Sequence, residues 1–93
     1  MKSLRTDLGQ AMRERRIAIG VSQELLGEFC ALDRTYISGI ERGVRNPTID
    51  SLSRIAEALE CNLSELISAA ESARDVRSKK SSNRNNPGPP KSK

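Results

Sequence analysis

The sequence predicts an all-α fold, a compact body of five short helices followed by a basic tail that we expect to be disordered. Through the body, apolar residues recur at spacings of three and four, and no stretch sustains the period-two alternation of a half-buried strand. Residues that start and stop helices separate these apolar runs. The 93-residue chain contains one Phe, one Tyr and no Trp, so its core must be built mainly from aliphatic side chains. This length allows one small domain.

The first two helices are predicted from their caps and inward residues. One is expected from about Leu4 to Ile19, with Gly20 ending it in the left-handed conformation. Ser22 can cap the next helix, because a serine hydroxyl accepts a hydrogen bond from the exposed backbone N–H groups of the first turn. Leu26 and Cys30 then point inward, one turn apart.

Asp33 is expected to cap a third helix that has two different faces. Ile37 and Ile40 lie one turn apart and predict the inner face. The outer face is polar and rich in hydrogen-bonding groups: Arg34, Thr35, Ser38 and Arg42. Only a few residues around Ala31 and Leu32 separate this helix from the previous one. The two helices therefore cannot lie antiparallel and should meet at a steep angle, so that the third projects outward.

Two further helices complete the predicted body. Pro47 and Thr48 start one of them, and Asn62 with Glu65 forms a capping-box pattern at the start of the other. The apolar stripe of the fourth helix consists of Ile49, Leu52, Ile55, Ala56 and Leu59, and that of the fifth consists of Leu63, Leu66, Ile67 and Ala70.

The charge of the chain divides it near residues 72–78. The whole chain carries a net charge of +4, whereas residues 72–93 hold seven basic residues and one acidic residue, a net charge of +6. We therefore expect a domain over residues 4–71 and a disordered basic tail over 72–93, which is rich in Ser, Asn, Pro and Gly. Such a tail can bind phosphates without fixed geometry by displacing counterions, or it can simply keep the protein in solution.

The composition argues against several classes of protein. The chain has no histidine to act as a general base, no glycine-rich phosphate loop and no activating partner for its two cysteines, so we expect no enzyme activity and no cofactor. Cys30 and Cys61 are too few for a zinc site and are expected to be buried thiols in a reducing compartment. The chain shows no leader peptide and no apolar run that could cross a bilayer, so we expect a cytoplasmic location and no membrane partner.

The run SQELLGEFCALDRTYISGIERGVRNPTIDSLSRIAEAL, within residues 4–67, resembles the Cro/repressor-type (XRE) helix-turn-helix family. The resemblance implies a lambda-repressor-like DNA-binding domain, with the helix-turn-helix motif at about residues 23–42. The segments DRTYISGIERG and RNPTI are also similar to the controller proteins of restriction-modification systems.

The resemblance implies a set of DNA-contacting residues. Gln23 matches a position at the start of the second helix that holds a phosphate. Arg34, Thr35 and Ser38 match positions that meet base edges, and arginine can bond guanine O6 and N7 together. Tyr36, Arg42, Arg45 and Asn46 match positions at the DNA backbone or groove margin. The alternative is that these residues form a solvated face, and Tyr36 alone could instead serve packing.

Other matched positions are structural, and some depart from the family pattern. Arg16 and Glu41 match a largely buried ion pair between the first and third helices. Where the family commonly has Ala, this chain has Gly27, and where it has Gly at the turn, this chain has Ala31. Either Ala31 keeps a strained left-handed conformation, or the turn is slightly reshaped.

The second helix also carries apolar residues where the family commonly has polar ones. Leu25 and Phe29 lie four residues apart at such positions. Either Phe29 folds back against a neighbouring helix, or the pair forms a patch that binds a partner.

The expected partners are double-stranded DNA and a second copy of the chain. Because one recognition helix reads only a few base pairs, we expect a homodimer on a palindromic operator, with half-sites about 10 base pairs apart or a near multiple of that spacing. Leu63, Leu66 and Ile67 of the fifth helix should divide between core and dimer interface. No effector domain is visible, so no small-molecule effector is expected. The alternative function is a protein-interaction module of the same fold, such as an antitoxin or anti-repressor.

Overall fold

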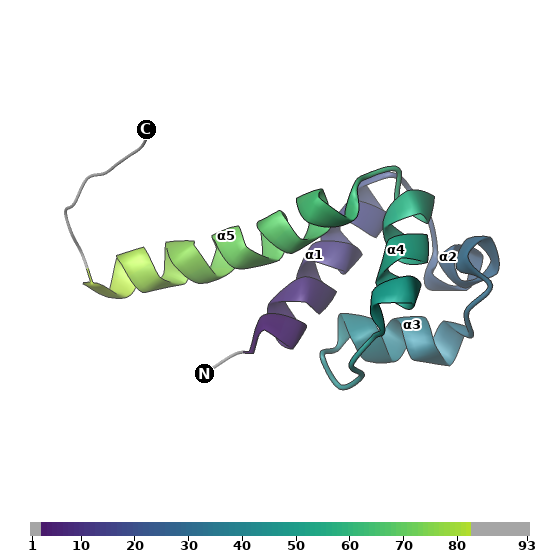
Figure 1. Cartoon of the computed structure of the whole chain (residues 1–93), viewed down its shortest axis with the longest axis horizontal. Coiled ribbons are helices and arrows are strands. Elements are labelled where there is room, and N and C mark those ends of the chain that lie inside the picture. Colours follow the sequence, from purple (N-terminus) through teal and green to yellow (C-terminus); the bar gives the residue numbers. More distant parts are fainter. Residues whose placement is uncertain (1–2, 83–93) are drawn as a thin grey trace.

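The computed structural model describes the backbone of residues 3–82 and the side chains of residues 3–73. This part of the chain forms five helices and no strand, which confirms the all-α prediction. The helices are α1 (Leu4–Ala18), α2 (Gln23–Cys30), α3 (Arg34–Glu41), α4 (Ile49–Ala58) and α5 (Leu63–Ser82). In Figure 1, α1 and α4 stand above α3, while α2 closes one end of the body and α5 extends from the other.

Side-chain caps start the helices at the expected places. Four caps accept a hydrogen bond from a backbone N–H two or three residues later: Ser3, Ser22, Asp33 and Thr48. The backbone N–H of Asn62 donates to Glu65 Oε1 at 2.8 Å, which is one half of a capping box. The helix starts therefore follow from hydrogen bonds between residues close together in the sequence.

The turn between α2 and α3 depends on two unusual backbone positions. Ala31 adopts the left-handed conformation, with φ 58° and ψ 41°, which is the first of the two alternatives that the sequence left open. Leu32 folds back so that its backbone N–H donates to the carbonyl oxygen of Gly27 at 2.9 Å. A Cβ atom on Gly27 would lie 2.6 Å from the Leu32 carbonyl oxygen, so only glycine allows this close approach. Gly27 and Ala31, the two residues that depart from the family pattern, therefore both belong to the turn between α2 and α3.

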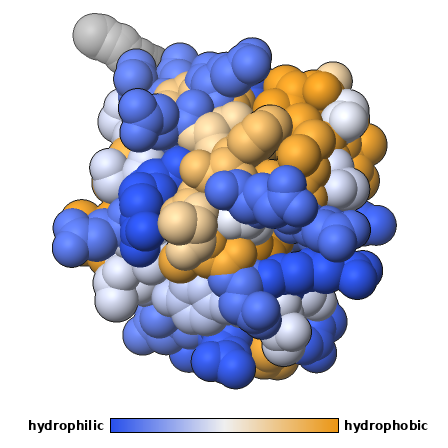
Figure 2. All heavy atoms as spheres, turned by 90° about the vertical axis from the view of Figure 1, so that its right-hand side faces the viewer, coloured by the Kyte–Doolittle hydropathy of each residue, from blue (hydrophilic) through white to orange (hydrophobic). Residues whose placement is uncertain are grey.

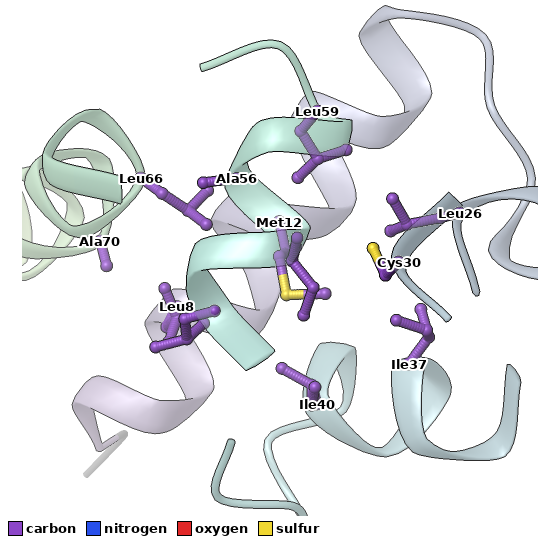
Figure 3. Close-up of a cluster of buried hydrophobic side chains, with 12 residues drawn as sticks. Leu8, Met12, Leu26, Cys30, Ile37, Ile40, Ala56, Leu59, Leu66 and Ala70 are labelled. Carbon is purple, nitrogen blue, oxygen red and sulfur yellow. The ribbon is translucent and has the colours of Figure 1, made fainter. Parts of the chain in front are cut away.

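The core lies between the five helices (Figure 3). Its largest fully buried side chains are Met12, Leu26, Cys30, Ile37, Ile40, Ile55 and Leu59. α1 contributes Met12 at the centre, with α2, α3 and α4 packed around it and α5 closing one side. Because every helix supplies side chains to a single cluster, the outward face of α3 is fixed relative to the whole body.

Two arginine side chains bond to carbonyl oxygens at helix C-termini. Arg15 on α1 donates from Nε to Leu59 O and from Nη2 to Glu60 O, each at 2.9 Å, at the end of α4. Arg54 on α4 donates from Nη1 to Cys30 O at 3.2 Å, at the end of α2. These bonds satisfy carbonyl groups that have no partner within their own helix.

Two features of the helices differ from the sequence prediction. Ile49 lies on the predicted apolar stripe of α4 but is 70% exposed. It is the first residue of α4, and a helical side chain leans toward the preceding turn, so it projects past the part of α4 that is packed. Helix α5 continues to Ser82, further than the boundary expected near residues 72–78. Residues 72–82 contain no Gly or Pro to end a helix, and residues 83–93 of the predicted tail lie outside the described residues.

Both cysteines are free thiols. Cys30 is buried as predicted, whereas Cys61 is only partly buried. Burial raises the pKa of both thiols, which keeps them in the less reactive protonated form. Over the described residues, no helix is both long and apolar enough to span a membrane.

Candidate nucleic-acid interface

The two faces of α3 differ as the sequence predicted. Ile37 and Ile40 are fully buried, while Arg34 and Thr35 are exposed and Ser38 is half-buried. The backbone N–H of Thr35 is bonded to the Asp33 carboxylate, at 3.0 Å, so the first turn is held in place. The three predicted base-contacting residues therefore lie on the outer side of α3, the helix along the lower edge of the body in Figure 1.

A buried ion pair fixes the other end of α3. Arg16 donates from Nε to Glu41 Oε2 at 2.7 Å and from Nη2 to Oε1 at 2.9 Å, and its Nη1 donates to Val21 O at 2.9 Å. The Arg16 side chain is 11% exposed and the Glu41 side chain is 2% exposed. The hydrogen bonds to Glu41 raise the pKa of Arg16, which favours the charged form of its guanidinium group. This confirms the predicted structural pair between α1 and α3.

Gln23 belongs to the same network, which the sequence did not predict. Its Nε2 donates to Glu41 Oε1 at 3.0 Å. A side-chain amide nitrogen carries two N–H groups, so this bond leaves a second donor for a phosphate. The residue expected to contact phosphate is thereby tied to α3 through Glu41, and the N-terminus of α2 is held beside it.

The remaining predicted contact residues surround α3. Arg42 caps its C-terminus and is exposed, as are Arg45 and Asn46 in the loop that follows. Tyr36 is half-buried and packs against the core, which fits the alternative that it serves packing. The guanidinium carbon of Arg45 lies over the Tyr36 ring, 5.8 Å from the ring centroid.

The charge of this surface is positive. Three exposed arginines lie on α3 or just after it, Arg34, Arg42 and Arg45, and they outnumber the exposed carboxylate of Asp33 at the N-cap, while Glu41 is buried and paired with Arg16. Exposed guanidinium groups attract a polyanion such as DNA. The surface of α3 therefore combines positive charge with hydrogen-bonding groups of the kind that read base edges.

The outer face of α2 has a different character. Leu25 is 39% exposed and Phe29 is 59% exposed, so the expectation that Phe29 folds back against a neighbouring helix is wrong. Leu26 and Cys30 occupy the inward positions, and the adjacent residues of the helix are turned away from the core. Figure 2, which views the molecule from the α2 side, shows hydrophobic surface gathered among hydrophilic residues.

The predicted interface residues on α5 differ in burial. Leu66 is 3% exposed and belongs to the core of the single chain. Leu63 and Ile67 are half-buried and pack at the edge of that core. Of the three predicted interface residues, Leu63 and Ile67 therefore keep part of their surface exposed, whereas Leu66 does not.

Comparisons with known proteins agree with this geometry. Residues 12–66 match the family model described as Helix-turn-helix. The control protein C.BamHI of Bacillus amyloliquefaciens is 45% identical over 58 residues, covering 61% of this chain and 72% of that protein. The control protein C.MunI of Mycoplasma sp. is 36% identical over 72 residues, covering 76% of this chain and 97% of that protein.

A solved structure supports the same relationship. The restriction-modification controller protein C.AhdI from Aeromonas hydrophila matches with a TM-score of 0.65 and 43% identity, covering 66% of this chain and 92% of that chain. The chain therefore belongs to the XRE-type helix-turn-helix family, among relatives that include restriction-modification controller proteins.

Proposed function

We propose that this protein is a sequence-specific DNA-binding transcriptional regulator that places α3 in the major groove. The observation that carries the proposal is the outer face of α3, where Arg34, Thr35 and Ser38 lie opposite the buried Ile37 and Ile40. A helix of this width fits the major groove, where each base pair presents a distinct pattern of donors and acceptors. Family membership as a helix-turn-helix regulator supports the DNA-binding role.

Each contact residue has a role that follows from its chemistry. Arg34 bonds guanine O6 and N7, and Thr35 offers a hydroxyl and a methyl group that can touch thymine. Ser38 adds one hydroxyl. Gln23 uses its second amide N–H, together with the N-terminus of α2, to hold a phosphate. Arg42 and Asn46 lie at the DNA backbone, where contacts position the protein without reading sequence.

We further propose that the protein acts as a homodimer on a palindromic operator. α3 has only eight residues and reads a few base pairs, so two copies are needed for a site of useful length. The exposed parts of Leu63 and Ile67 on α5 are the proposed interface. Half-sites should lie about 10 base pairs apart or at a near multiple of that spacing. A protein that stays monomeric on its best site would contradict this assembly.

Selection of bound sequences from a random DNA pool tests the function directly. We expect the full chain to enrich a palindromic sequence, which then serves as the probe for variants. Arg34→Ala should lose about 1–3 kcal/mol of binding free energy and relax the preference at one base of each half-site. Gln23→Ala should weaken binding to all sequences alike, because it removes a phosphate contact. The exposed Arg13 on α1 provides a matched control for the loss of one positive charge.

The selection also separates this function from the alternative. The exposed Leu25 and Phe29 on α2 favour, as a second candidate, a module that binds another protein through this fold, such as an antitoxin or anti-repressor. A chain that enriches no sequence from the pool would support that candidate. An unchanged ratio of operator to random-DNA affinity for Arg34→Ala would remove Arg34 from the reading face.

The relatives suggest which genes it regulates. Because C.BamHI and C.AhdI are control proteins, the latter of a restriction-modification system, we infer a controller of this kind. Neighbouring genes for a restriction enzyme and a DNA methyltransferase would support this inference, and a different gene neighbourhood would contradict it.

A further inference from the structure

The chain after α3 turns back onto the helix it has just left. Gly43 has φ 77°, and its N–H donates to Ile40 O at 3.0 Å while the N–H of Val44 donates to Gly39 O at 2.9 Å. This pair of bonds is a Schellman motif, which reverses the chain at the C-terminus of a helix. The N–H of Arg45 also donates to Gly39 O, at 3.1 Å. Arg45 is therefore held beside α3 by its own backbone.

Gly39 leaves room for the Arg45 side chain on the surface of α3. A Cβ atom at Gly39 would overlap Arg45 Cγ, and it would lie 3.4 Å from Arg45 Cβ and 3.5 Å from its Cδ. The aliphatic stem of Arg45 thus occupies the space that any other residue at position 39 would fill. Gly39 itself is buried under this stem although it lies on a helix at the edge of the body.

Tyr36 then receives the charged end of the same side chain. It precedes Gly39 by one helical turn, so both lie on one face of α3. The guanidinium carbon of Arg45 is 5.8 Å from the ring centroid, within the range of a cation–π interaction. The Arg45 side chain therefore lies along α3. Its aliphatic part packs over Gly39, and its guanidinium group contacts the Tyr36 ring.

We propose that Gly39 and Tyr36 are positioning residues that hold the Arg45 guanidinium at the edge of the reading face before DNA binds. Arg45 thereby becomes a preorganised member of that face instead of a flexible cation of the loop. This inference rests on the proposed DNA-binding function. A long side chain normally loses rotamer freedom on binding, and prior ordering removes part of that cost. In this fixed orientation, the Arg45 guanidinium contacts a base edge or the phosphate next to it.

The variant Gly39→Ala separates positioning from stability. Alanine favours a helix over glycine, so the melting temperature should stay constant or rise by a few degrees. The new methyl group displaces the Arg45 stem, so affinity for the selected operator should fall about three- to tenfold. A merely structural role for Gly39 would move stability and affinity in the same direction.

A double-mutant cycle identifies the residue through which Gly39 acts. Arg45→Ala should weaken operator binding about tenfold, the scale of one good arginine contact, while Arg13→Ala should change it less than twofold. Gly39→Ala combined with Arg45→Ala should bind no worse than Arg45→Ala alone, because the methyl group then has no side chain to displace. Additive losses would mean that the methyl group disturbs DNA directly, and would overturn the inference.

A measurement on the protein without DNA tests the arrangement itself. In the NMR spectrum of the full chain, the Arg45 side-chain protons should be shifted by the Tyr36 ring, and Gly39→Ala or Tyr36→Leu should abolish that shift. Unshifted protons in the unmodified protein would overturn the inference while leaving the proposed function intact. Conversely, shifted protons in a protein that enriches no DNA sequence would contradict the proposed function, and with it the reading role of Arg45.

Discussion

Helices α2 and α3 are alike in build and opposite in their outer faces. Each has eight residues, each is capped at its N-terminus by a polar side chain, and each buries residues against the same core. The outer face of α2 presents Leu25 and Phe29 beside the exposed carboxylates of Glu24 and Glu28. The outer face of α3 presents Arg34 with neutral hydroxyl groups. Phosphates repel the acidic outer face of α2 and attract the outer face of α3, so outward chemistry distinguishes the helix that we propose to read bases from the helix that supports it.

A similar division exists within α3. Its inner side and its C-terminal Glu41 connect it to the core and to α1, and its outer side carries the residues that we propose contact DNA. Variants of the inner side should therefore change stability first, and variants of the outer side should change binding alone.

The largest expected effect is on the inner side, at the buried ion pair. Glu41→Ala leaves Arg16, whose side chain is 11% exposed, without its carboxylate partner. Loss of one member of a buried pair costs about 3–5 kcal/mol of the free energy of unfolding, and urea denaturation measures it. The double variant Arg16→Met/Glu41→Leu is the control and should recover most of the loss, because no charge remains buried. A loss below about 1 kcal/mol for Glu41→Ala would show that the pair is well solvated.

The turn between α2 and α3 should respond next. Gly27→Ala brings a Cβ atom to 2.6 Å from the Leu32 carbonyl oxygen, so the backbone of the turn must shift. We expect a loss of about 1–3 kcal/mol in the free energy of unfolding, the usual cost of overpacking, although alanine normally favours a helix. Thermal unfolding measures the change. A gain in stability would mean that the two helices can separate slightly at no cost, and that their crossing is less fixed than the structure indicates.

The same turn offers a stabilising substitution. Ala31 has φ 58°, a conformation that costs an L-residue about 1–2 kcal/mol and costs glycine almost nothing. Ala31→Gly should therefore raise the free energy of unfolding by about 1 kcal/mol, less the extra flexibility of glycine in the unfolded chain. Glu60, with φ 63°, is a matched second position at which glycine should give a gain of similar size. If Glu60→Gly stabilised the protein and Ala31→Gly did not, the backbone strain expected at Ala31 would be absent in solution.

The smallest effect is expected on the outer face of α2. Phe29 is 59% exposed, so Phe29→Gln should change the free energy of unfolding by no more than about 0.5 kcal/mol. Its affinity for operator DNA should stay within about twofold of the parent, in contrast to Arg34→Ala, where a loss of 1–3 kcal/mol corresponds to at least about fivefold. Titration of both variants against the selected operator makes the comparison. A large loss of affinity for Phe29→Gln would place α2 in the DNA interface as well.

The sequence by itself determined the five helices and the two faces of α3. Ser22, Asp33 and Thr48 cap helices because a side-chain oxygen and a backbone N–H two or three residues later are always close in space. The inward position of Ile37 and Ile40, and with it the outward position of Arg34, follows from helical periodicity alone. The resemblance to the helix-turn-helix family placed a turn at Ala31, but it left open whether this residue would be left-handed or the turn reshaped.

The tertiary structure decided what depends on residues distant in the sequence or on where a helix meets its neighbours. Gln23 bonds to Glu41 because α2 and the end of α3 meet there, and local pattern gave no signal of it. The exposure of Ile49 and Phe29 could not be predicted, because an apolar residue in the sequence does not reveal where the helices that would cover it end. Leu66 is buried in the single chain, whereas Leu63 and Ile67 keep part of their surface, because α1 and α4 cover only one side of α5. Arg45 lies on α3 because Gly43 turns the chain back and Gly39 leaves room for its stem, and only packing in three dimensions brings those conditions together.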